Sequence, residues 1–181
     1  LLGMPPQKPP YDADKGRQFI KSASLVQQLQ SYGMPGISSA WTFGLGGCRL
    51  LVVVAIKQLY LGHARQVGHA AYSGPLASYL GRYVVVVDDD IDPSDLNDVM
   101  WAILTRSDPA TSIDIVTRAN SGPLDPRICP EDRAAGKFGN SRGIIDATMP
   151  FEWKDKFPTP VRPDMDWRKE SRKKFGYLFE R

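Results

Sequence analysis

Residues 50–56 read LLVVVAI, and this run decides the fold class of the 181-residue chain. Its apolar residues follow one another without alternation, and residues 83–87 (YVVVV) repeat the pattern. A strand that is apolar on both faces is buried on both faces, which is typical of a parallel or mixed sheet covered by helices. The chain is therefore predicted to form an α/β fold with a mixed, largely parallel sheet flanked by helices.

The segment before these runs predicts one helix and two strands. Apolar residues recur at three- and four-residue spacing over residues 19–29, and the sequence GMPG at residues 33–36 ends the predicted helix. Residues 37–43 have the composition of a strand. The glycine-rich turn at residues 44–47 then leads into a strand over residues 49–56.

A strand–helix–strand unit is predicted in the middle of the chain. A helix over residues 62–71 precedes the strand 83–87. Asp92 is the predicted N-cap of the next helix, and Pro93 is its predicted first residue. One apolar face of this helix is marked by Leu96, Val99, Met100, Ile103 and Leu104. Because a strand over residues 113–117 follows, the unit is predicted to be a right-handed crossover between parallel strands.

The carboxyl-terminal part of the sequence has a looser pattern. Residues 118–143 are rich in proline and glycine, and only residues 144–146 indicate a short strand. A loop region of this length is usually functional or wraps another part of the structure. Residues 164–179 predict a helix with four aromatic anchors: Trp167, Phe175, Tyr177 and Phe179. Nothing nearby in the sequence covers these anchors, so this helix is expected to dock onto another domain or subunit.

Composition excludes several classes of protein. With 42% apolar and 24% charged residues, the chain has the composition of a folded globular protein rather than a disordered one. A net charge of +3 is small for a nucleic-acid binder. The apolar run at residues 50–56 is too short to span a bilayer, and no targeting segment is apparent, so a cytoplasmic location is expected. Two cysteines do not form a disulfide framework.

Acidic residues follow the strand 83–87 at its carboxyl end, where α/β sheets place their ligand sites. Asp88, Asp89 and Asp90 could hold Mg²⁺ or accept a phosphoryl group. Alternatively, they form a turn that favours the positive N-terminus of the next helix. No second strand-end carboxylate is apparent, so both interpretations stay open.

Lys57 and His63 form a second candidate group. Lys57 ends the strand 49–56, and His63 stands at the start of the helix that follows. Together with a helix N-terminus, they could face an anionic ligand. The alternative is a solvated lysine and a capping histidine. His69 lies within the helix and is expected to be packed or exposed, and two histidines make a histidine-based metal site improbable.

Four segments together resemble the UbiD family of prenylated-FMN-dependent decarboxylases. They are residues 57–67 (KQLYLGHARQV), 84–115 (VVVVDDDIDPSDLNDVMWAILTRSDPATSIDI), 121–126 (SGPLDP) and 140–153 (NSRGIIDATMPFEW). The resemblance covers nearly the whole chain but matches only the carboxyl-terminal third of a family member. It implies a linker from a missing central domain at residues 1–15, a carboxyl-terminal α/β domain at residues 16–150, and an extension with an oligomer-contact helix at residues 151–181.

The resemblance implies an activity that this chain does not complete alone. Family members decarboxylate aromatic, heteroaromatic or α,β-unsaturated acids reversibly through an adduct with prenylated FMN. Their catalytic Glu-Arg-Glu set, and the residues that hold Mn²⁺ and the flavin phosphate, belong to portions absent here. None of the chain's four glutamates lies in a matching motif: Glu131, Glu152, Glu170 and Glu180. The chain is therefore expected to act with a missing amino-terminal portion, within a homo-oligomer, on a small carboxylic acid.

The resemblance also implies roles for particular residues. The main chain of Arg106 matches a position that helps to bind K⁺ near the flavin phosphate. Gly122 and Leu124 match positions in the substrate pocket, and Gly122 replaces a bulky aromatic of some relatives, which implies a larger pocket or room for a ring substituent. The remaining expected contributors are Tyr79 and Leu80 in a loop near the cofactor, and Lys57 and Arg17 at the pocket.

Two other functions stay open from the sequence. The chain could be a non-catalytic subunit that assembles through its last helix. It could also be a Mg²⁺-binding phosphotransfer module built on Asp88–Asp90.

Overall fold

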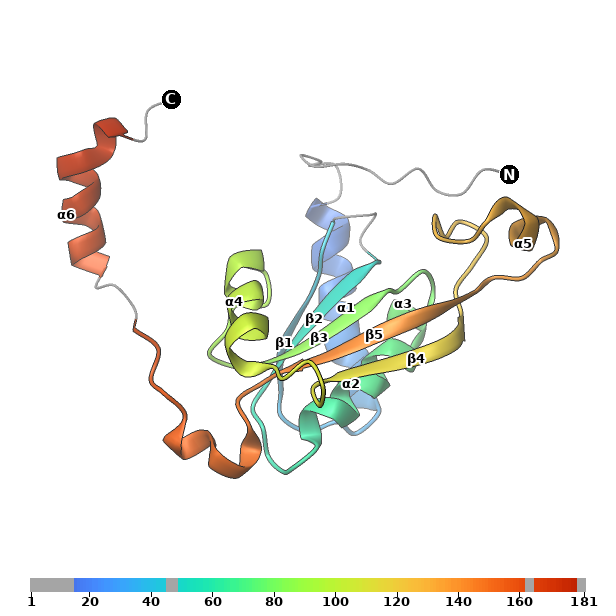
Figure 1. Ribbon diagram of the computed structural model, residues 1–181, viewed down its shortest axis with the longest axis horizontal. Helices are drawn as coiled ribbons and strands as arrows, with labels where there is room; N and C mark the ends of the chain where they lie inside the picture. Colours follow the sequence, from blue (N-terminus) through green and yellow to red (C-terminus); the bar gives the residue numbers. More distant parts are fainter. Residues whose placement is uncertain (1–14, 45–48, 162–164, 179–181) are drawn as a thin grey trace.

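The computed structural model describes residues 15–44, 49–161 and 165–178, which form a five-stranded sheet flanked by helices (Figure 1). The strand order is β1-β2-β3-β5-β4. The strands are β1 (Ile37–Thr42), β2 (Leu51–Ile56), β3 (Tyr83–Asp88), β4 (Ile113–Asn120) and β5 (Gly139–Ala147). The three central strands β2, β3 and β5 are parallel, and the two edge strands are antiparallel to their neighbours. The predicted mixed α/β fold is confirmed.

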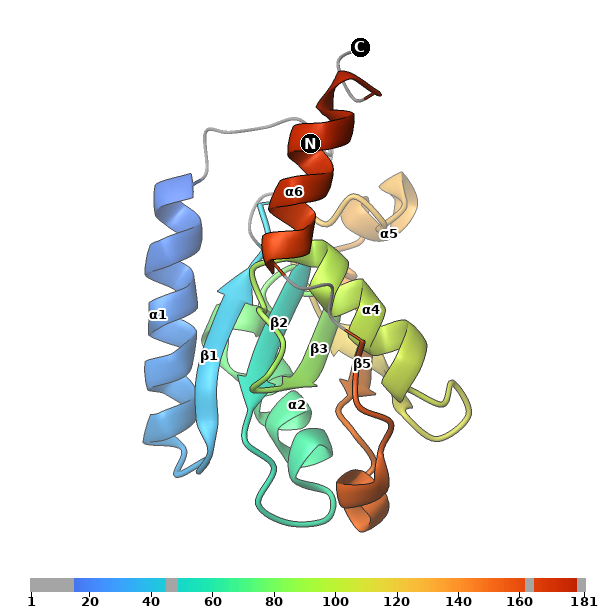
Figure 2. The same cartoon turned by 90° about the vertical axis from the view of Figure 1, so that its left-hand side faces the viewer.

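Helices cover both faces of this sheet (Figures 1 and 2). One face carries α1 (Lys15–Ser31), α2 (His63–Ser73) and α3 (Pro75–Ser78), and the other carries α4 (Leu96–Arg106). Along β2, Val52 and Val54 belong to the core under α1 and α2, while Val53 and Ala55 belong to the core under α4. The uninterrupted apolar run therefore reflects burial of β2 on both faces, as its sequence predicts.

The predicted crossover between β3 and β4 is wrong. The strand β5 lies between them, paired parallel to β3 and antiparallel to β4. The physical reason is burial: Ile144 and Ala147 of β5 are 2% and 0% exposed, whereas Ile115 of β4 is 63% exposed. A strand with one open face is suited to the edge of the sheet, and β5, whose Ile144 and Ala147 are buried, takes the central place.

The helix α4 begins later than the sequence predicts. Its N-cap is Asp95, whose carboxylate accepts a hydrogen bond from the Asn97 N–H at 2.8 Å. The carboxylate of Asp92 instead accepts the N–H and the hydroxyl of Ser94, which makes a turn before the helix, and Pro93 lies in that turn. The prediction of Asp92 and Pro93 as the helix start is therefore wrong.

The buried face of α4 also differs from the predicted one. Val99 and Ala102 are buried against the sheet. Three of the predicted core positions are instead exposed: Leu96, Met100 and Leu104. Trp101 and Ile103 are partly buried against the same core, so the sheet-facing side of the helix includes large side chains as well as small ones.

The loop region and the tail contain more regular structure than predicted. The strand β5 starts at Gly139 rather than at residue 144, and α5 (Pro130–Ala134) lies within the loop region. A 3₁₀ helix, η1 (Phe151–Lys156), precedes α6 (Met165–Phe175) and η2 (Gly176–Leu178). Figure 1 shows α6 set apart from the sheet. The predicted terminal helix is thus confirmed.

Some predictions fall outside the described residues. These are most of the linker (residues 1–14), most of the glycine-rich turn (residues 45–47) and Phe179, and the side chain of Trp167 is likewise not described. Within the described part of the chain, no helix has the length and apolar character needed to cross a membrane.

Candidate functional site

The expected site residues divide between the two ends of the sheet. Lys57 directly follows β2, and Arg106 contacts the last residue of β3, so both lie at the carboxyl end of the parallel strands. Tyr79 precedes β3, and Gly122 follows the antiparallel strand β4, so both lie at the amino end. The structure therefore brings Tyr79 and Gly122 together and separates them from Lys57 and Arg106.

Arg17 belongs to the amino-end group. The adjacent residue Gln18 accepts a hydrogen bond through its backbone oxygen from Thr42, and Thr42 pairs with Val52 near the start of β2. The first turn of α1 therefore lies at the amino end of the parallel strands, as Tyr79 does.

At the carboxyl end, Arg106 holds two carboxylates. Its guanidinium is 2.9 Å from a carboxylate oxygen of Asp88 and binds both oxygens of Asp90, at 2.8 and 2.7 Å. Burial opposes the charge of Arg106, but the hydrogen bonds and charges of Asp90 and Asp88 raise its pKa. Burial raises the pKa of Asp88, against hydrogen bonds from Met149 N–H and Gln58 and the charge of Arg106.

This arrangement contradicts the interpretation of residues 88–90 as a magnesium site. Asp88 and Asp90 direct their oxygens to Arg106, whose side chain is fully buried between the end of α4 and the end of β3. Among the residues that the structure describes, no three His, Cys, Asp or Glu side chains are grouped to hold a metal ion. The ion pairs of Arg106 with Asp88 and Asp90 therefore connect the end of α4 to the end of β3. The binding of K⁺ by the main chain of Arg106 stays a prediction.

Of the two interpretations of His63, the one in which its side chain faces an anionic ligand is wrong. The imidazole of His63 is fully buried, accepts the Leu59 N–H at Nδ1 and donates from Nε2 to the Pro35 oxygen at 3.0 Å. Burial lowers the pKa of His63, although the hydrogen bond to Pro35 opposes this, and the neutral ring satisfies both contacts. The helix N-cap is Gly62, and Lys57 is exposed.

His69 lies on the outer side of α2. Its Nε2 is 3.0 Å from a carboxylate oxygen of Asp114, which Arg65 also contacts at 2.8 Å. This surface cluster involves none of the expected pocket residues.

At the amino end, the ring of Tyr79 occupies the space beside Gly122. A Cβ built on Gly122 would lie 2.3 Å from Cε2 of Tyr79, which is far inside van der Waals contact. The aromatic ring of Tyr79 therefore fills the space that a larger residue at position 122 would take, and the effect of Gly122 on the size of a substrate pocket stays a prediction. The guanidinium of Arg49 lies over the same ring, 5.0 Å from its centroid.

Leu80 and Leu124, which lie near Tyr79 and Gly122 in the sequence, differ in their exposure to solvent. Leu80 is 1% exposed and has a φ of +64°, so its side chain belongs to the core and its backbone makes a tight turn. Leu124 is 42% exposed. Of the two residues expected near the cofactor, only Tyr79 is partly accessible.

The loop that carries Gly122 and Leu124 is held by a carboxylate that sequence reasoning missed. Asp125 is fully buried and accepts hydrogen bonds from the Ser121 hydroxyl, the Arg82 guanidinium, the Arg127 N–H and the Asn140 amide. Burial disfavours its charge, but the hydrogen bonds from Ser121 and Arg127 and the charge of Arg82 together lower the pKa of Asp125.

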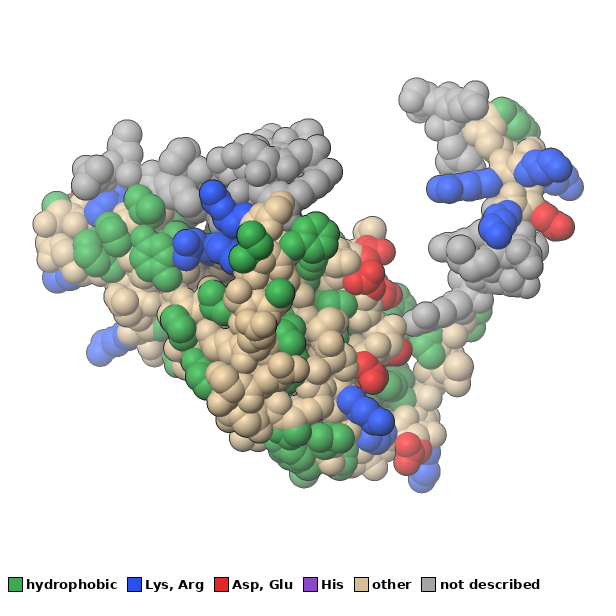
Figure 3. Space-filling view, turned by 180° about the vertical axis from the view of Figure 1, so that it is seen from behind, with side chains coloured by type: hydrophobic (Ala, Val, Ile, Leu, Met, Phe, Trp, Pro, Cys, Tyr) green, Lys and Arg blue, Asp and Glu red, His purple; other side chains and the backbone are tan. Residues whose placement is uncertain are grey.

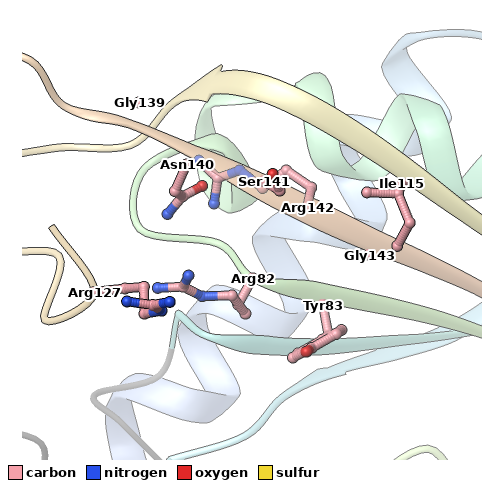
Figure 4. A pocket seen from close by; sticks show the side chains of 9 residues that line it. All are labelled: Arg82, Tyr83, Ile115, Arg127, Gly139, Asn140, Ser141, Arg142 and Gly143. Carbon is pink, nitrogen blue, oxygen red and sulfur yellow. The ribbon is translucent and has the colours of Figure 1, made fainter.

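A cavity of about 460 Å³ lies beside this network (Figure 4). It is lined by Arg82, Tyr83, Ile115, Arg127, Gly139, Asn140, Ser141, Arg142 and Gly143. Arg142 is 3% exposed and donates from Nη2 to the backbone oxygens of Ser78 and Asn120. Burial is the main cause that lowers the pKa of Arg142. The motifs SGPLDP and NSRG contain Asp125 of the hydrogen-bond network and Arg142 of the cavity lining, respectively.

Comparison with known proteins gives one family match. A model of the 3-octaprenyl-4-hydroxybenzoate carboxy-lyase C-terminal domain (UbiD C-terminal domain) matches residues 17–147. The chain is also 33% identical over 132 residues to the phenolic acid decarboxylase of Sedimentibacter hydroxybenzoicus, over 71% of this chain and 25% of that protein.

Solved structures with a similar fold include a UbiD-class enzyme and a decarboxylase. The UbiD-class enzyme HmfF from Pelotomaculum thermopropionicum, in complex with FMN, matches with a TM-score of 0.68 and 27% identity over 81% of this chain and 31% of that chain. The vanillic acid decarboxylase of Sedimentibacter hydroxybenzoicus, in an open form, matches with a TM-score of 0.64 and 28% identity over 90% of this chain and 33% of that chain. The chain thus spans about a quarter to a third of the length of these relatives.

Proposed function

Because this chain belongs to the family of UbiD carboxy-lyase C-terminal domains, we propose that it is the carboxyl-terminal part of a UbiD-like decarboxylase. Its substrates would be aromatic, heteroaromatic or α,β-unsaturated carboxylic acids. The similarity to a phenolic acid decarboxylase and a vanillic acid decarboxylase supports an aromatic acid in particular. The companion portion, absent from this chain, would supply the catalytic glutamates and arginine.

The structural observation that supports this proposal is the hydrogen-bonded loop at residues 121–128, at the amino end of the parallel strands. The Asp125 network and the hydrogen bonds from Arg133 to the Pro123, Asp125 and Ile128 oxygens hold this loop. In the proposed enzyme, Gly122 and Leu124 would form one wall of the substrate pocket, and Tyr79 would lie in the loop near the flavin. A wall built from a held loop positions a planar acid and excludes water from it.

The cofactors proposed for the complete enzyme are those of the UbiD family. Prenylated FMN would act as the electron sink while CO₂ leaves, and it would be held, with Mn²⁺, mainly by the companion portion. The FMN bound to the similar HmfF enzyme supports a flavin. The main chain at Arg106 would contribute to a K⁺ site. Arg17 would approach the pocket from the start of α1, whereas Lys57 lies at the opposite end of the sheet.

The test is reconstitution. The chain is mixed with the companion portion and prenylated FMN, and CO₂ release from an aromatic acid is measured. We expect activity well above that of the companion portion alone, and a loss of that gain in Leu124→Asp. The matched control is Leu104→Asp, on the exposed face of α4. If the chain adds nothing to the companion portion, the proposal fails.

A second function, assembly through the terminal helix, is favoured by one observation. Phe175, the last residue of α6, is 42% exposed, and Tyr177 in the adjoining η2 is 69% exposed. Figure 1 shows α6 away from the sheet. Large aromatic side chains at an exposed helix end are suited to contact another subunit.

Replacement of Phe175 and Tyr177 by serine should then lower the mass measured by light scattering. Val161→Ser is the matched control, because Val161 is 97% exposed and lies before the helix. An unchanged mass in the double variant would exclude α6 as the contact.

A further inference from the structure

The first turns of α4 carry apolar side chains that face solvent. Leu96 and Met100 lie one helical turn apart and are 36% and 44% exposed, so they form one apolar surface. The helix packs on the sheet through a different side, which contains Val99 and Ala102. An apolar helix face that its own chain leaves open is suited to contact another protein surface.

The start of α4 is also strongly acidic. Residues 88–105 include six aspartates and no lysine or arginine. Two of them pair with Arg106, whereas Asp92 and Asp95 are exposed at the amino end of the helix. Hydrogen bonds from the hydroxyl and the N–H of Ser94 lower the pKa of Asp92, so this carboxylate is charged at neutral pH. We call the following four residues the α4 surface: Asp92, Asp95, Leu96 and Met100.

The end of the terminal helix has the complementary character. The last turn of α6 contains Arg172, Lys173 and Lys174, which are all exposed. Phe175 and Tyr177 lie at the same end and are 42% and 69% exposed. In Figure 3, Lys and Arg side chains gather on α6, and Asp and Glu side chains lie on the side of the body that carries α4. The helix end therefore combines positive charge with aromatic area, and the α4 surface combines negative charge with aliphatic area.

Contact between the two surfaces is favoured by three physical effects. Opposite charges across an interface attract and fix its register. The carboxyl end of one helix dipole is negative and the amino end of the other is positive, so the end of α6 suits the start of α4. The rings of Phe175 and Tyr177 would bury apolar area on Leu96 and Met100, and methionine sulfur packs favourably on aromatic rings.

A second copy of the chain is the occupant that these surfaces fit. Within one chain, α6 is set apart from α4 (Figure 1). A second copy presents the same basic and aromatic helix end. In a pair with two-fold symmetry, each copy would place its α6 on the α4 surface of the other, so the contact would be made twice.

We propose that the end of α6 in one copy docks on the α4 surface of a second copy. This inference rests on the proposed assembly through the terminal helix and names the surface that receives it. A contact made by one helix end covers the first two turns of α4, so Leu104 lies outside it. The contact needs neither flavin nor turnover, and its outcome is therefore independent of the decarboxylase assay.

The test is the dissociation constant of self-association of the 181-residue chain, measured by sedimentation equilibrium. Met100→Lys places a positive charge opposite the basic end of α6 and should weaken association at least about tenfold. Met100→Glu removes the same side chain but keeps the favourable sign of charge, so it should weaken association less. The matched control is Leu61→Lys, in the loop after β2, where Leu61 is 65% exposed, and it should associate as the parent does. Equal effects of the two Met100 variants, or a Met100→Lys variant that matches the control, would overturn the proposal.

Charge reversal separates a lost contact from a lost fold. A chain with Arg172→Glu, Lys173→Glu and Lys174→Glu should associate weakly, because its helix end then has the charge of the α4 surface. Addition of Met100→Lys to that chain should restore part of the association, and a failure to do so would contradict the proposal. If the serine variant of Phe175 and Tyr177 has a lower mass but Met100→Lys does not, α6 assembles on another surface. In that case the proposed assembly stands and the α4 surface is excluded.

Discussion

Tyr79 and Gly122 share one space at the amino end of β3. The glycine is required there because the tyrosine ring leaves no room for even a methyl group. The identity of residue 122 and the position of residue 79 are therefore coupled. The effects of substitutions at the two positions on the free energy of unfolding should not be additive.

The variant Gly122→Ala tests this coupling. The added Cβ would lie 2.3 Å from the Tyr79 ring, so the ring must move, at a cost of about 1–3 kcal/mol in the free energy of unfolding. Urea denaturation measures this cost. In the background Tyr79→Ala the same change should cost much less. Equal costs in both backgrounds would show that the two residues do not compete for space.

Asp125 makes the protein sensitive to acid. Its pKa is lowered in the folded state, so its contribution to stability is present above the ordinary aspartate pKa of about 3.9 and is lost as the pH falls through the lowered value. The variant Asp125→Asn should destabilise the protein by about 3 kcal/mol at pH 7, because it leaves Arg82 without its buried partner.

Urea denaturation of both proteins at several pH values measures this effect. The difference between parent and variant should be largest above pH of about 4 and should shrink on acidification. A difference that stays constant down to the acid range would contradict the assigned ionisation of Asp125.

At the scale of single elements, α4 shows how a cap decides where a helix starts. Three aspartates lie near the start of the helix: Asp92, Asp95 and Asp98. Of these, Asp95 is the N-cap, because its carboxylate accepts a hydrogen bond from the N–H of Asn97 in the first turn of the helix. Asp92 is engaged with Ser94, and the carboxylate of Asp98 accepts the N–H of Asp92. Asp92, Asp95 and Asp98 therefore each have a hydrogen-bonding role at the start of α4.

Asp95→Ala should lower the free energy of unfolding by about 1 kcal/mol, the usual value of an N-cap. Asp89→Ala is the matched control, since Asp89 is an exposed member of the same run, and it should change stability by less than about 0.5 kcal/mol. Thermal unfolding of both variants checks this. If the control is as damaging as the cap variant, net charge rather than capping stabilises the region.

The elements also show what a sequence can predict. The strands β2 and β3 are apparent because their burial on both faces leaves continuous apolar runs. The place of β5 is not apparent, since residues 139–143 are polar or glycine and pair with neighbours that only the folded sheet supplies. Likewise, Asp125 and Asn140 are ordinary loop residues until long-range contacts bring them together. Local patterns thus predict the elements, and non-local pairing sets the topology and the site.

At the scale of the whole molecule, the chain consists of a sheet-based body and a separate terminal helix (Figures 1 and 2). The connecting segment after η1 ends at Val161 in the described part and is strongly exposed there. The terminal helix therefore contributes little to the stability of the body.

Removal of residues 158–181 should change the free energy of unfolding by less than about 0.5 kcal/mol. Unfolding is measured at low protein concentration, where subunit association does not add to stability. A large loss of stability would mean that α6 packs on the body of its own chain.

The pairing of β3 with β5 has a consequence for synthesis on the ribosome. Val84 pairs with Ile144, so the centre of the sheet joins segments about 60 residues apart, and β5 is the strand with which β4 pairs. Until β5 has been made, a nascent chain presents β3 with an unpaired hydrogen-bonding edge that other chains can reach. The last strand to emerge therefore closes the sheet, and premature termination before residue 139 would release an aggregation-prone product.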